Sequence, residues 1–347
     1  NDAIFKIIGS DFITIQNFTM QENPANTITT SGSNNMTEWG VALIYASTTN
    51  GAQNIAVNNC SISLNRTYQN TFGIYSNSTH SATAPTTNAT ATSPAGSNSG
   101  LSILGNTISN VNMGIVVVGP TAAANHNEGL TIGAFENGNI ITNFGTTGTI
   151  SSYANVSGTV NGILVRNTRN FNVSYNTITS SVGGTTSGTL NGIQMPAYSN
   201  APTGTFTNNI TYNTISLQSA NASGAINGIN YLGTSASTTS VVNITNNDFN
   251  TFGHTVAGSG SIGFINTAGT HLNQTISNNT FTNISVNTTG SVTFIAHSYS
   301  IPSTGSMVIS NNAIVTGFTK TGAGGTVTLT TTNSASGTGS VNNYTNN

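Results

Sequence analysis

One short phrase recurs along most of the chain: an apolar residue, any two residues, an asparagine, one further residue and a second apolar residue. It runs from residues 103–108 (ILGNTI) to residues 309–314 (ISNNAI). The asparagines follow one another at intervals of 32 to 37 residues, and Cys60 holds the equivalent place 46 residues before Asn106. A period of this length indicates a repeat architecture in which each period is one structural unit.

Each period is predicted to contain strands and no helix. A second phrase, glycine followed by valine, isoleucine or phenylalanine, lies between copies of the first, from Gly40-Val41 to Gly263-Phe264. Both phrases are short β-branched runs bounded by Asn and Gly, which is typical of strands and turns. A period built of strands alone predicts one coil of a β-solenoid per repeat.

The recurring asparagine is predicted to form a ladder. Successive coils of a solenoid stack ~4.8 Å apart, so equivalent residues of neighbouring coils lie over one another. Asparagine can adopt a left-handed turn conformation and offers both a donor and an acceptor, so stacked Asn side chains can bond to one another and to turn backbone. The predicted ladder positions are Cys60, Asn106, Asn139, Asn176, Asn213, Asn247, Asn279 and Asn312.

Composition excludes several classes of partner. Charged residues make up 3% of the chain, against about 25% in a typical soluble protein, and the net charge is −2. Five Lys and Arg residues in total are too few for a basic surface that binds nucleic acid or anionic lipid. No apolar run approaches the ~18 residues of a membrane span. We therefore expect neither nucleic-acid binding nor direct membrane insertion.

The stacked coils and the asparagine ladder resemble right-handed parallel β-helices of the pectate-lyase-like superfamily. Two Asn/Thr-rich segments, residues 38–54 (EWGVALIYASTTNGAQN) and 58–66 (NNCSISLNR), look like parts of very large secreted surface proteins of Bacteroidetes, which typically use the type IX secretion route. The resemblance covers most of residues 1–320 and implies a fold and a style of protein, not an activity. It implies a secreted or cell-surface location, with neighbouring domains or chains of a surface assembly as partners.

A catalytic site would require clustered carboxylates. Glycoside hydrolysis uses two carboxyl groups within ~10 Å, and calcium-assisted lyase chemistry needs several oxygen ligands. Asp248 and Glu38 each stand alone among the residues expected to stack above and below them. The expectation is therefore a protein that is not an enzyme and has no cofactor and no metal site.

Four acids, Asp2, Asp11, Glu22 and Glu38, fall within the first 38 residues, next to the single tryptophan, Trp39. One interpretation is a binding or active site across the first coils, with Glu38 and Trp39 as ligand-binding residues. The other is a solvated end coil.

Two further groups of side chains leave alternatives open. Tyr175 and Tyr212 precede ladder asparagines in adjacent coils, so they are expected to stack, either as a platform for a sugar or as simple packing. The insertion at residues 126–139 carries His126, Glu128 and Glu136, which would bind a cation or merely occupy a turn.

The predicted fold is an all-β, right-handed parallel β-helix of about eight or nine coils, one domain spanning residues 1–347 and part of a longer protein. The predicted function is a non-catalytic structural or adhesive module of an exported cell-surface protein. The alternative is a carbohydrate-active enzyme (polysaccharide lyase or glycoside hydrolase) or a carbohydrate-binding module, with its site at the N-terminal coils around Asp11, Glu38, Trp39 and Arg66. A third hypothesis is a filament subunit that stacks end to end, because exposed terminal strands pair readily.

Overall fold

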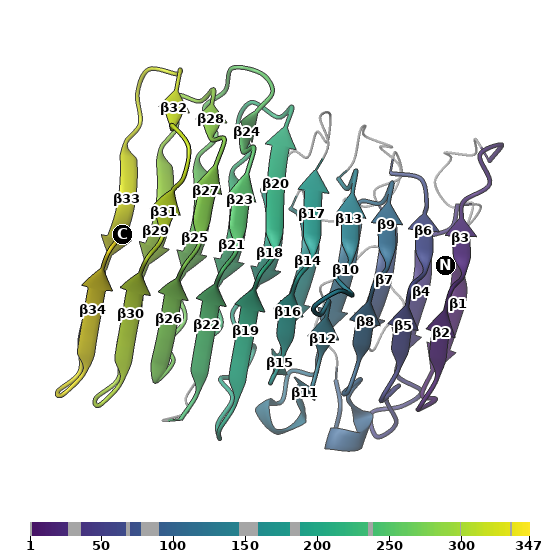
Figure 1. Cartoon of the computed structure of the whole chain (residues 1–347). Coiled ribbons are helices and arrows are strands. Elements are labelled where there is room, and N and C mark those ends of the chain that lie inside the picture. Colours follow the sequence, from purple (N-terminus) through teal and green to yellow (C-terminus); the bar gives the residue numbers. More distant parts are fainter. Residues whose placement is uncertain are drawn as a thin grey trace.

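The protein is a right-handed parallel β-helix whose coils follow one another along a single axis, as the computed structural model shows (Figure 1). The structure describes residues 2–26, 36–66, 70–77, 90–145, 159–180, 188–234, 239–298, 300–333 and 335–347. Three long sheets run along the rod. Each coil contributes one strand to each sheet in turn, except the last, which among the described residues contributes to the first two sheets only. The predicted fold class is confirmed.

The first sheet has ten strands in parallel register. They are β1 (Ala3–Ile8), β4 (Trp39–Ile44), β7 (Phe72–Asn77), β10 (Met113–Val118), β14 (Val160–Arg166), β18 (Leu190–Met195), β21 (Ile226–Tyr231), β25 (Ile262–Thr267), β29 (Val292–His297) and β33 (Val327–Thr332). The described residues therefore form ten coils, one more than the upper expectation, because the coil of β33 has no copy of the complete asparagine phrase.

The second sheet also has ten strands, β2 (Thr14–Gln16), β5 (Ala56–Asn58), β8 (Ser102–Leu104), β12 (Thr131–Ile132), β16 (Asn172–Ser174), β19 (Thr207–Thr211), β22 (Val241–Thr245), β26 (Asn273–Ser277), β30 (Ser306–Ser310) and β34 (Val341–Thr345). The third runs through β3 (Thr19–Gln21), β6 (Ser61–Ser63), β9 (Thr107–Ser109), β13 (Ile140–Thr142), β17 (Thr177–Ser180), β20 (Thr214–Ser219), β23 (Asp248–Asn250), β27 (Thr280–Thr282) and β31 (Ala313–Ile314), with β24 (Gly253–His254) paired to β20.

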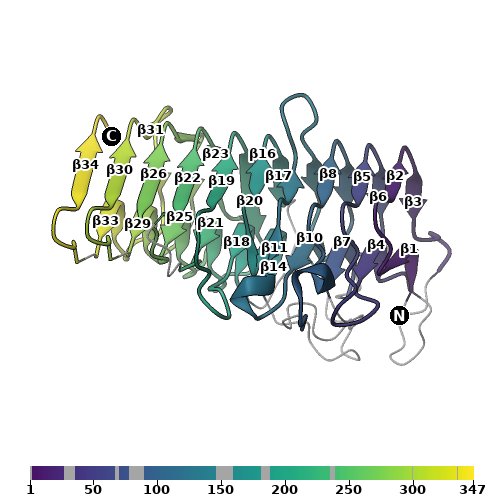
Figure 2. The ribbon, with the colours of Figure 1, turned by 90° about the horizontal axis from the view of Figure 1, so that it is seen from below.

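A few short elements lie outside the three long sheets. Two short strand pairs are β11 (Asn127–Glu128) with β15 (Thr168–Arg169), and β28 (Ser285–Val286) with β32 (Thr319–Lys320). Two 3-10 turns, η1 (Pro94–Gly96) and η2 (Ala123–Asn125), lie beside the early coils (Figure 2).

Parallel register places like residues over like in the interior. Val41, Ile74 and Ile115 of the first sheet are direct neighbours and fully buried. A glycine column lies beside them, because β-branched side chains of the third sheet pack on this backbone. A Cβ added at Gly114 would lie 2.7 Å from Cγ2 of Ile141 and 2.4 Å from O of Gly162.

The glycine column ends where the core becomes aromatic. Asn227 pairs with Gly263 and Ile229 with Ile265, so Phe264, not Gly263, stands in the position of the earlier glycines. The ring of Phe264 lies 4.8 Å from that of Phe294 and 17° from parallel. The sequence alignment of the Gly263-Phe264 phrase with the earlier copies was thus displaced by one residue.

The asparagine ladder is present and has one rung beyond those predicted. The main-chain N–H and Nδ2 of each rung donate to Oδ1 of the rung in the next coil, and Nδ2 also donates to a main-chain carbonyl. The series starts at Cys60, whose N–H donates to Oδ1 of Asn106 at 2.9 Å, and continues beyond Asn312 to Asn347. The ladder links successive coils at the corner between the second and third sheets.

The residue before each rung has its own role. Asn59, Asn246, Asn278 and Asn311 all have φ between 53° and 58°, in the left-handed region that Asn tolerates. In the doublet "NN" the first asparagine therefore makes the turn, and the second makes the hydrogen bonds.

Candidate functional site

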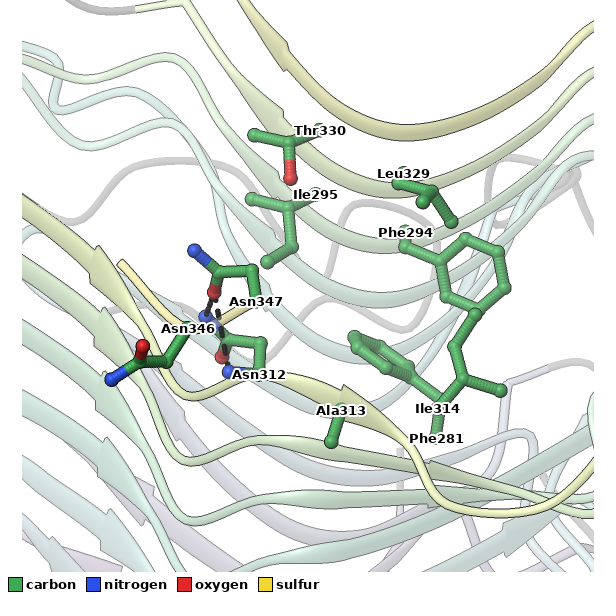
Figure 3. A pocket seen from close by; sticks show the side chains of 10 residues that line it. All are labelled: Phe281, Phe294, Ile295, Asn312, Ala313, Ile314, Leu329, Thr330, Asn346 and Asn347. Atoms are coloured by element: carbon green, nitrogen blue, oxygen red, sulfur yellow. Dashed lines mark hydrogen bonds between the residues drawn. The ribbon is translucent and has the colours of Figure 1, made fainter. Parts of the chain in front are cut away.

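The interior of the β-helix is open at its C-terminal end (Figure 3). A cavity of about 370 Å³ lies there. The rings of Phe281 and Phe294 form one side, and the ladder amides of Asn312 and Asn347 lie opposite (Figure 3). The remaining lining residues are Ile295, Ala313, Ile314, Leu329, Thr330 and Asn346. The cavity is thus lined by side chains from the interior columns of the rod.

Three interior positions show how incomplete this end is. Leu329 of β33 is 61% exposed, Tyr344 of β34 is 44% exposed and Ile314 of β31 is 38% exposed. One coil earlier the residues in the same columns are Phe294, Ile309 and Phe281, which are 2%, 0% and 2% exposed. The C-terminal end therefore presents core side chains to solvent.

The N-terminal end differs. Ile15 of β2 and Met20 of β3 belong to the first coil, yet they are only 3% and 2% exposed. Phe18 follows the left-handed Asn17, in the place of a ladder residue, and its ring lies 4.8 Å from that of Phe5. Phe18 itself is 48% exposed, so the first coil buries Ile15 and Met20 but leaves part of its apolar surface accessible.

Glu38 and Trp39, the ligand-binding residues predicted at the first coils, are both fully buried. The ring of Trp39 packs 6.2 Å from that of Phe72 and 5.7 Å from that of Tyr75, in a second apolar cluster on the outer face of the first sheet. Oε2 of Glu38 accepts a hydrogen bond from N of Asp2 at 2.5 Å, and burial raises the pKa of this carboxyl group. A ligand would have to displace this packing to reach either side chain.

Asp11 and Glu22, two further acids near the N-terminus, accept hydrogen bonds from different parts of the main chain. Asp11 lies between β1 and β2, and its Oδ1 accepts from N of Gln53 at 2.8 Å. Glu22 follows β3, and its Oε2 accepts from N of Thr37 at 2.6 Å. Each carboxylate thus stabilises a separate main-chain segment. Across the described ranges, no group of three or more His, Cys, Asp and Glu side chains is arranged to hold a metal ion.

Tyr175 and Tyr212 stack as expected. Their rings lie 4.7 Å apart and 2° from parallel, and Phe135 meets Tyr175 edge-on at 5.6 Å. A sugar platform needs a free ring face. Here Tyr175 and Tyr212 cover one face of each other, and Phe135 lies against Tyr175. Tyr212 remains 48% exposed, so the outer ring of this stack is accessible to solvent.

The insertion at residues 126–139 separates its three titratable side chains. His126 is buried and stacks on Tyr198 at 5.2 Å, and burial lowers its pKa to about 4. Glu128 forms an ion pair with Arg169 of the next coil. Glu136 lies in a turn with φ 60°. These three groups do not converge.

Sequence reasoning missed a buried polar chain between the first and second sheets. Nδ2 of Asn208 donates to the hydroxyl groups of Tyr198 and Tyr231, each at 3.0 Å. Nε2 of His271 lies 2.9 Å from the Tyr231 hydroxyl and 2.8 Å from O of Gly233. Nε2 of His297 lies 3.2 Å from Oε1 of Gln274, whose Nε2 donates to O of His271. No spacing in the sequence signals these contacts, because the partners come from four successive coils.

Amide columns also cover the outer face of the first sheet. Asn227 donates to Asn191 at 3.0 Å, and Asn266 donates to Asn230 at 2.9 Å. These two columns end at Gly263 and Ala296, whose small side chains leave a groove of about 220 Å³. Its polar lining is Asn227, Ser261, Asn266, Ser291 and Thr293, without a charged residue.

Comparison with protein-family models, with curated proteins and with solved structures found no match for this chain. In the part of the chain that the structure covers, no helix is long and apolar enough to cross a membrane.

Proposed function

We propose that this chain is a non-catalytic structural module of an exported cell-surface protein. The observation that carries the proposal is that its few reactive side chains serve the fold. The carboxylates of Asp11, Glu22 and Glu38 accept main-chain hydrogen bonds, and Asp248 accepts from the hydroxyl groups of Thr280 and Thr282.

The rod itself supports this role. Three sheets and a ladder of side-chain amides link the coils, so the molecule holds a fixed length and presents regular outer faces. The resemblance of residues 38–54 and 58–66 to large surface proteins of Bacteroidetes supports an exported, cell-surface location and type IX secretion. Membership of the pectate-lyase-like superfamily is part of the same proposal. Fold analogy alone does not transfer an activity.

An adhesive role has one specific observation in its favour. The groove at Asn227, Asn266 and Thr293 is uncharged and offers amide and hydroxyl groups above small residues. Such a lining suits a neutral sugar ring, which needs several directional hydrogen bonds and no ion pair. This groove, not the buried Glu38 and Trp39, is the surface on which carbohydrate binding should be sought.

The experiment that tests the proposal is incubation of the purified chain with neutral and acidic polysaccharides. We expect no new reducing ends and no unsaturated products. Glycan binding should be measured in parallel, with Thr293→Lys as the variant that blocks the groove and Thr328→Lys, one coil further along the same column, as its control. Turnover that Glu38→Gln or Asp11→Asn abolishes would overturn the structural role in favour of the enzyme.

A further inference from the structure

We infer that the groove on the outer face of the first sheet binds an acetamido group, and that its ligand is an uncharged sugar with an N-acetylated amino group. The groove lies over Gly263 and Ala296, where two columns of side-chain amides stop. The inference rests on the adhesive part of the proposed function and deepens it, because it names the class of sugar that the groove recognises.

The first amide column has a fixed direction. Asn191 donates from Nδ2 to Oδ1 of Asn161 at 2.9 Å, and Asn227 donates in the same way to Asn191 at 3.0 Å. Each amide thus turns its nitrogen toward the preceding coil and its oxygen toward the following one. Oδ1 of Asn227 is the last acceptor of this column, and no donor reaches it among the residues that the structure describes.

The next place in this column has no side chain. Gly263 of β25 pairs with Asn227, and a Cβ built on Gly263 would lie 3.1 Å from Oδ1 of Asn227. That oxygen therefore points into the space above Gly263. Thr293 of β29 pairs with Gly263 on the other side and lines the same groove, and its hydroxyl group has no hydrogen-bond partner in the described part of the chain. The column thus lacks one amide between an open acceptor and a hydroxyl group.

An acetamido group fits this gap. Its N–H and C=O point in opposite directions, because the amide is planar and trans. The N–H can donate to Oδ1 of Asn227 while the carbonyl oxygen accepts from the hydroxyl group of Thr293. The methyl group then lies over Gly263, and the sugar ring on the amide nitrogen points away from the sheet. A hydroxyl group in the same position is too short to reach both partners, since successive coils are ~4.8 Å apart.

The second amide column supplies a contact for the sugar ring. Asn266 donates from Nδ2 to Oδ1 of Asn230 at 2.9 Å, so its own Oδ1 is directed toward the following coil, where Ala296 has no polar side-chain atom. Ser261 adds a hydroxyl group to the lining. Sugar hydroxyl groups both donate and accept, so they suit this pair. A peptide amide could fill the gap at Gly263 but brings no ring of hydroxyl groups, and a sugar is therefore favoured.

The charge and the size of the groove narrow the ligand further. The residues that line it carry no charge, so a free amine or a carboxylate on the sugar would lose hydration without gaining an ion pair. Its volume of about 220 Å³ is small beside the roughly 300–1,000 Å³ of pockets that enclose drug-sized ligands. The groove therefore takes a single sugar residue, and we expect weak binding.

The test compares sugars that differ only in the acetamido group, by titration of the full chain followed by NMR. The probes are the methyl glycosides of N-acetylglucosamine and N-acetylgalactosamine, each beside that of glucose or galactose. We expect at least one N-acetylated sugar to bind roughly tenfold more tightly than its hydroxyl counterpart. Gly263→Asn should abolish this binding, because the new side-chain amide completes the column. A Cβ there meets only the end of the Asn227 side chain, so the fold should tolerate the change.

Thr293→Val provides a second variant with a matched control. It removes the hydroxyl group and keeps the shape of the side chain, so we expect binding to weaken roughly fivefold. Thr275→Val makes the same change on β26, at a residue of the second sheet that is also half-buried, and should leave binding unchanged. Thermal unfolding of the variants confirms that each is folded.

Four results would overturn the inference. They are no measurable binding of either N-acetylated sugar, equal affinity for both members of each pair, binding that survives Gly263→Asn, and equal affinity for N-methylacetamide, which carries the amide without a sugar ring. None of these results affects the polysaccharide assay of the non-catalytic role. Cleavage of a bound N-acetylated glycoside, by contrast, would contradict the non-catalytic role and leave this inference standing.

Discussion

Oδ1 of Asn139 accepts two hydrogen bonds from Asn106, one from the main-chain N–H at 3.0 Å and one from Nδ2 at 2.9 Å. The same pair of bonds recurs from rung to rung, so each buried amide satisfies polar groups of two coils. Removing one partner of a buried hydrogen bond is costly in folding free energy, because the other partner stays buried without a hydrogen bond.

We therefore expect Asn213→Ala to lower the free energy of unfolding by about 2–4 kcal/mol, since two donors of Asn176 and O of Val173 lose their partner in the interior. Asn209→Ala is the matched control, because Asn209 makes similar amide contacts on the outer face and should cost less than about 1 kcal/mol. Urea unfolding monitored by circular dichroism measures both. Equal losses would contradict the ladder as a major source of stability.

The packed glycines of the first sheet should not tolerate even a methyl group. In Gly114→Ala the new methyl group would meet O of Gly162 and Cγ2 of Ile141 at less than 3 Å, so the sheets must separate. We expect a loss of about 1–3 kcal/mol, the usual cost of overpacking.

Gly317→Ala serves as the control for this change, because a Cβ there has nothing within 4 Å. Its stability should stay within about 0.5 kcal/mol of the unmodified chain. Thermal unfolding of the two variants side by side distinguishes them, and a harmless Gly114→Ala would show that the two sheets can move apart freely.

The fold could be predicted because the same pattern of strands and turns recurs once per coil, and a regular period implies that the coils stack. It could not place Glu38 and Trp39, since the strand WGVALI is apolar on both faces and its sequence does not say that the outer face is covered. The strand register at Gly263 also could not be predicted from the neighbouring sequence. It is set by the packing of Phe264 against Phe249 and Phe281, which lie in the third sheet.

The last rung, Asn347, escaped prediction for a simpler reason. Tyr344 and Asn347 fit the first half of the phrase, but the second apolar residue would lie beyond the final residue. The ladder hydrogen bonds identify it directly.

Burial of histidine predicts loss of stability in mild acid. Burial lowers the pKa of both His271 and His297 to about 4, from an ordinary value of 6.5. The unfolded chain therefore binds these protons at higher pH than the folded chain, so the free energy of unfolding falls as the pH drops from about 6.5 towards 4. For one fully buried imidazole the full loss is about 3 kcal/mol.

Urea midpoints at pH 7.5, 6 and 5 measure this dependence. The double variant His271→Gln and His297→Gln should show a flatter profile, even if its stability at pH 7.5 is lower. Midpoints of the unmodified chain that do not change between pH 7.5 and 5 would contradict neutral, buried imidazoles.

Glu38→Gln tests whether the charge at the first coils is needed. Burial raises the pKa of Glu38, so the folded state disfavours its ionised form, while a glutamine still accepts from N of Asp2. We expect stability at pH 7 to be unchanged or higher, and the difference to vanish as the pH falls below the raised pKa. Asp11→Asn, at an exposed carboxylate, should have little effect. A large loss of stability in Glu38→Gln would show that the carboxylate charge is itself a structural requirement.

Tyr212 tests the role of the residue before each rung. Its φ is 58°, the same as that of Asn246 in the next coil and close to that of Asn278. Asparagine tolerates this region, whereas a β-branched side chain is strained there. Replacing Tyr212 by Asn loses the stack on Tyr175, worth about 0.5–1.5 kcal/mol, but relieves the backbone, so the net change should be small.

Tyr212→Val loses the same stack and adds strain, so we expect it to be less stable than Tyr212→Asn by about 1–3 kcal/mol. Thermal unfolding of the two variants measures the difference. If they proved equally stable, the left-handed turn would not be what selects asparagine at this position, and the first residue of each Asn doublet would need another explanation. If they differ as expected, the doublet follows from backbone geometry in its first residue and from hydrogen bonding in its second.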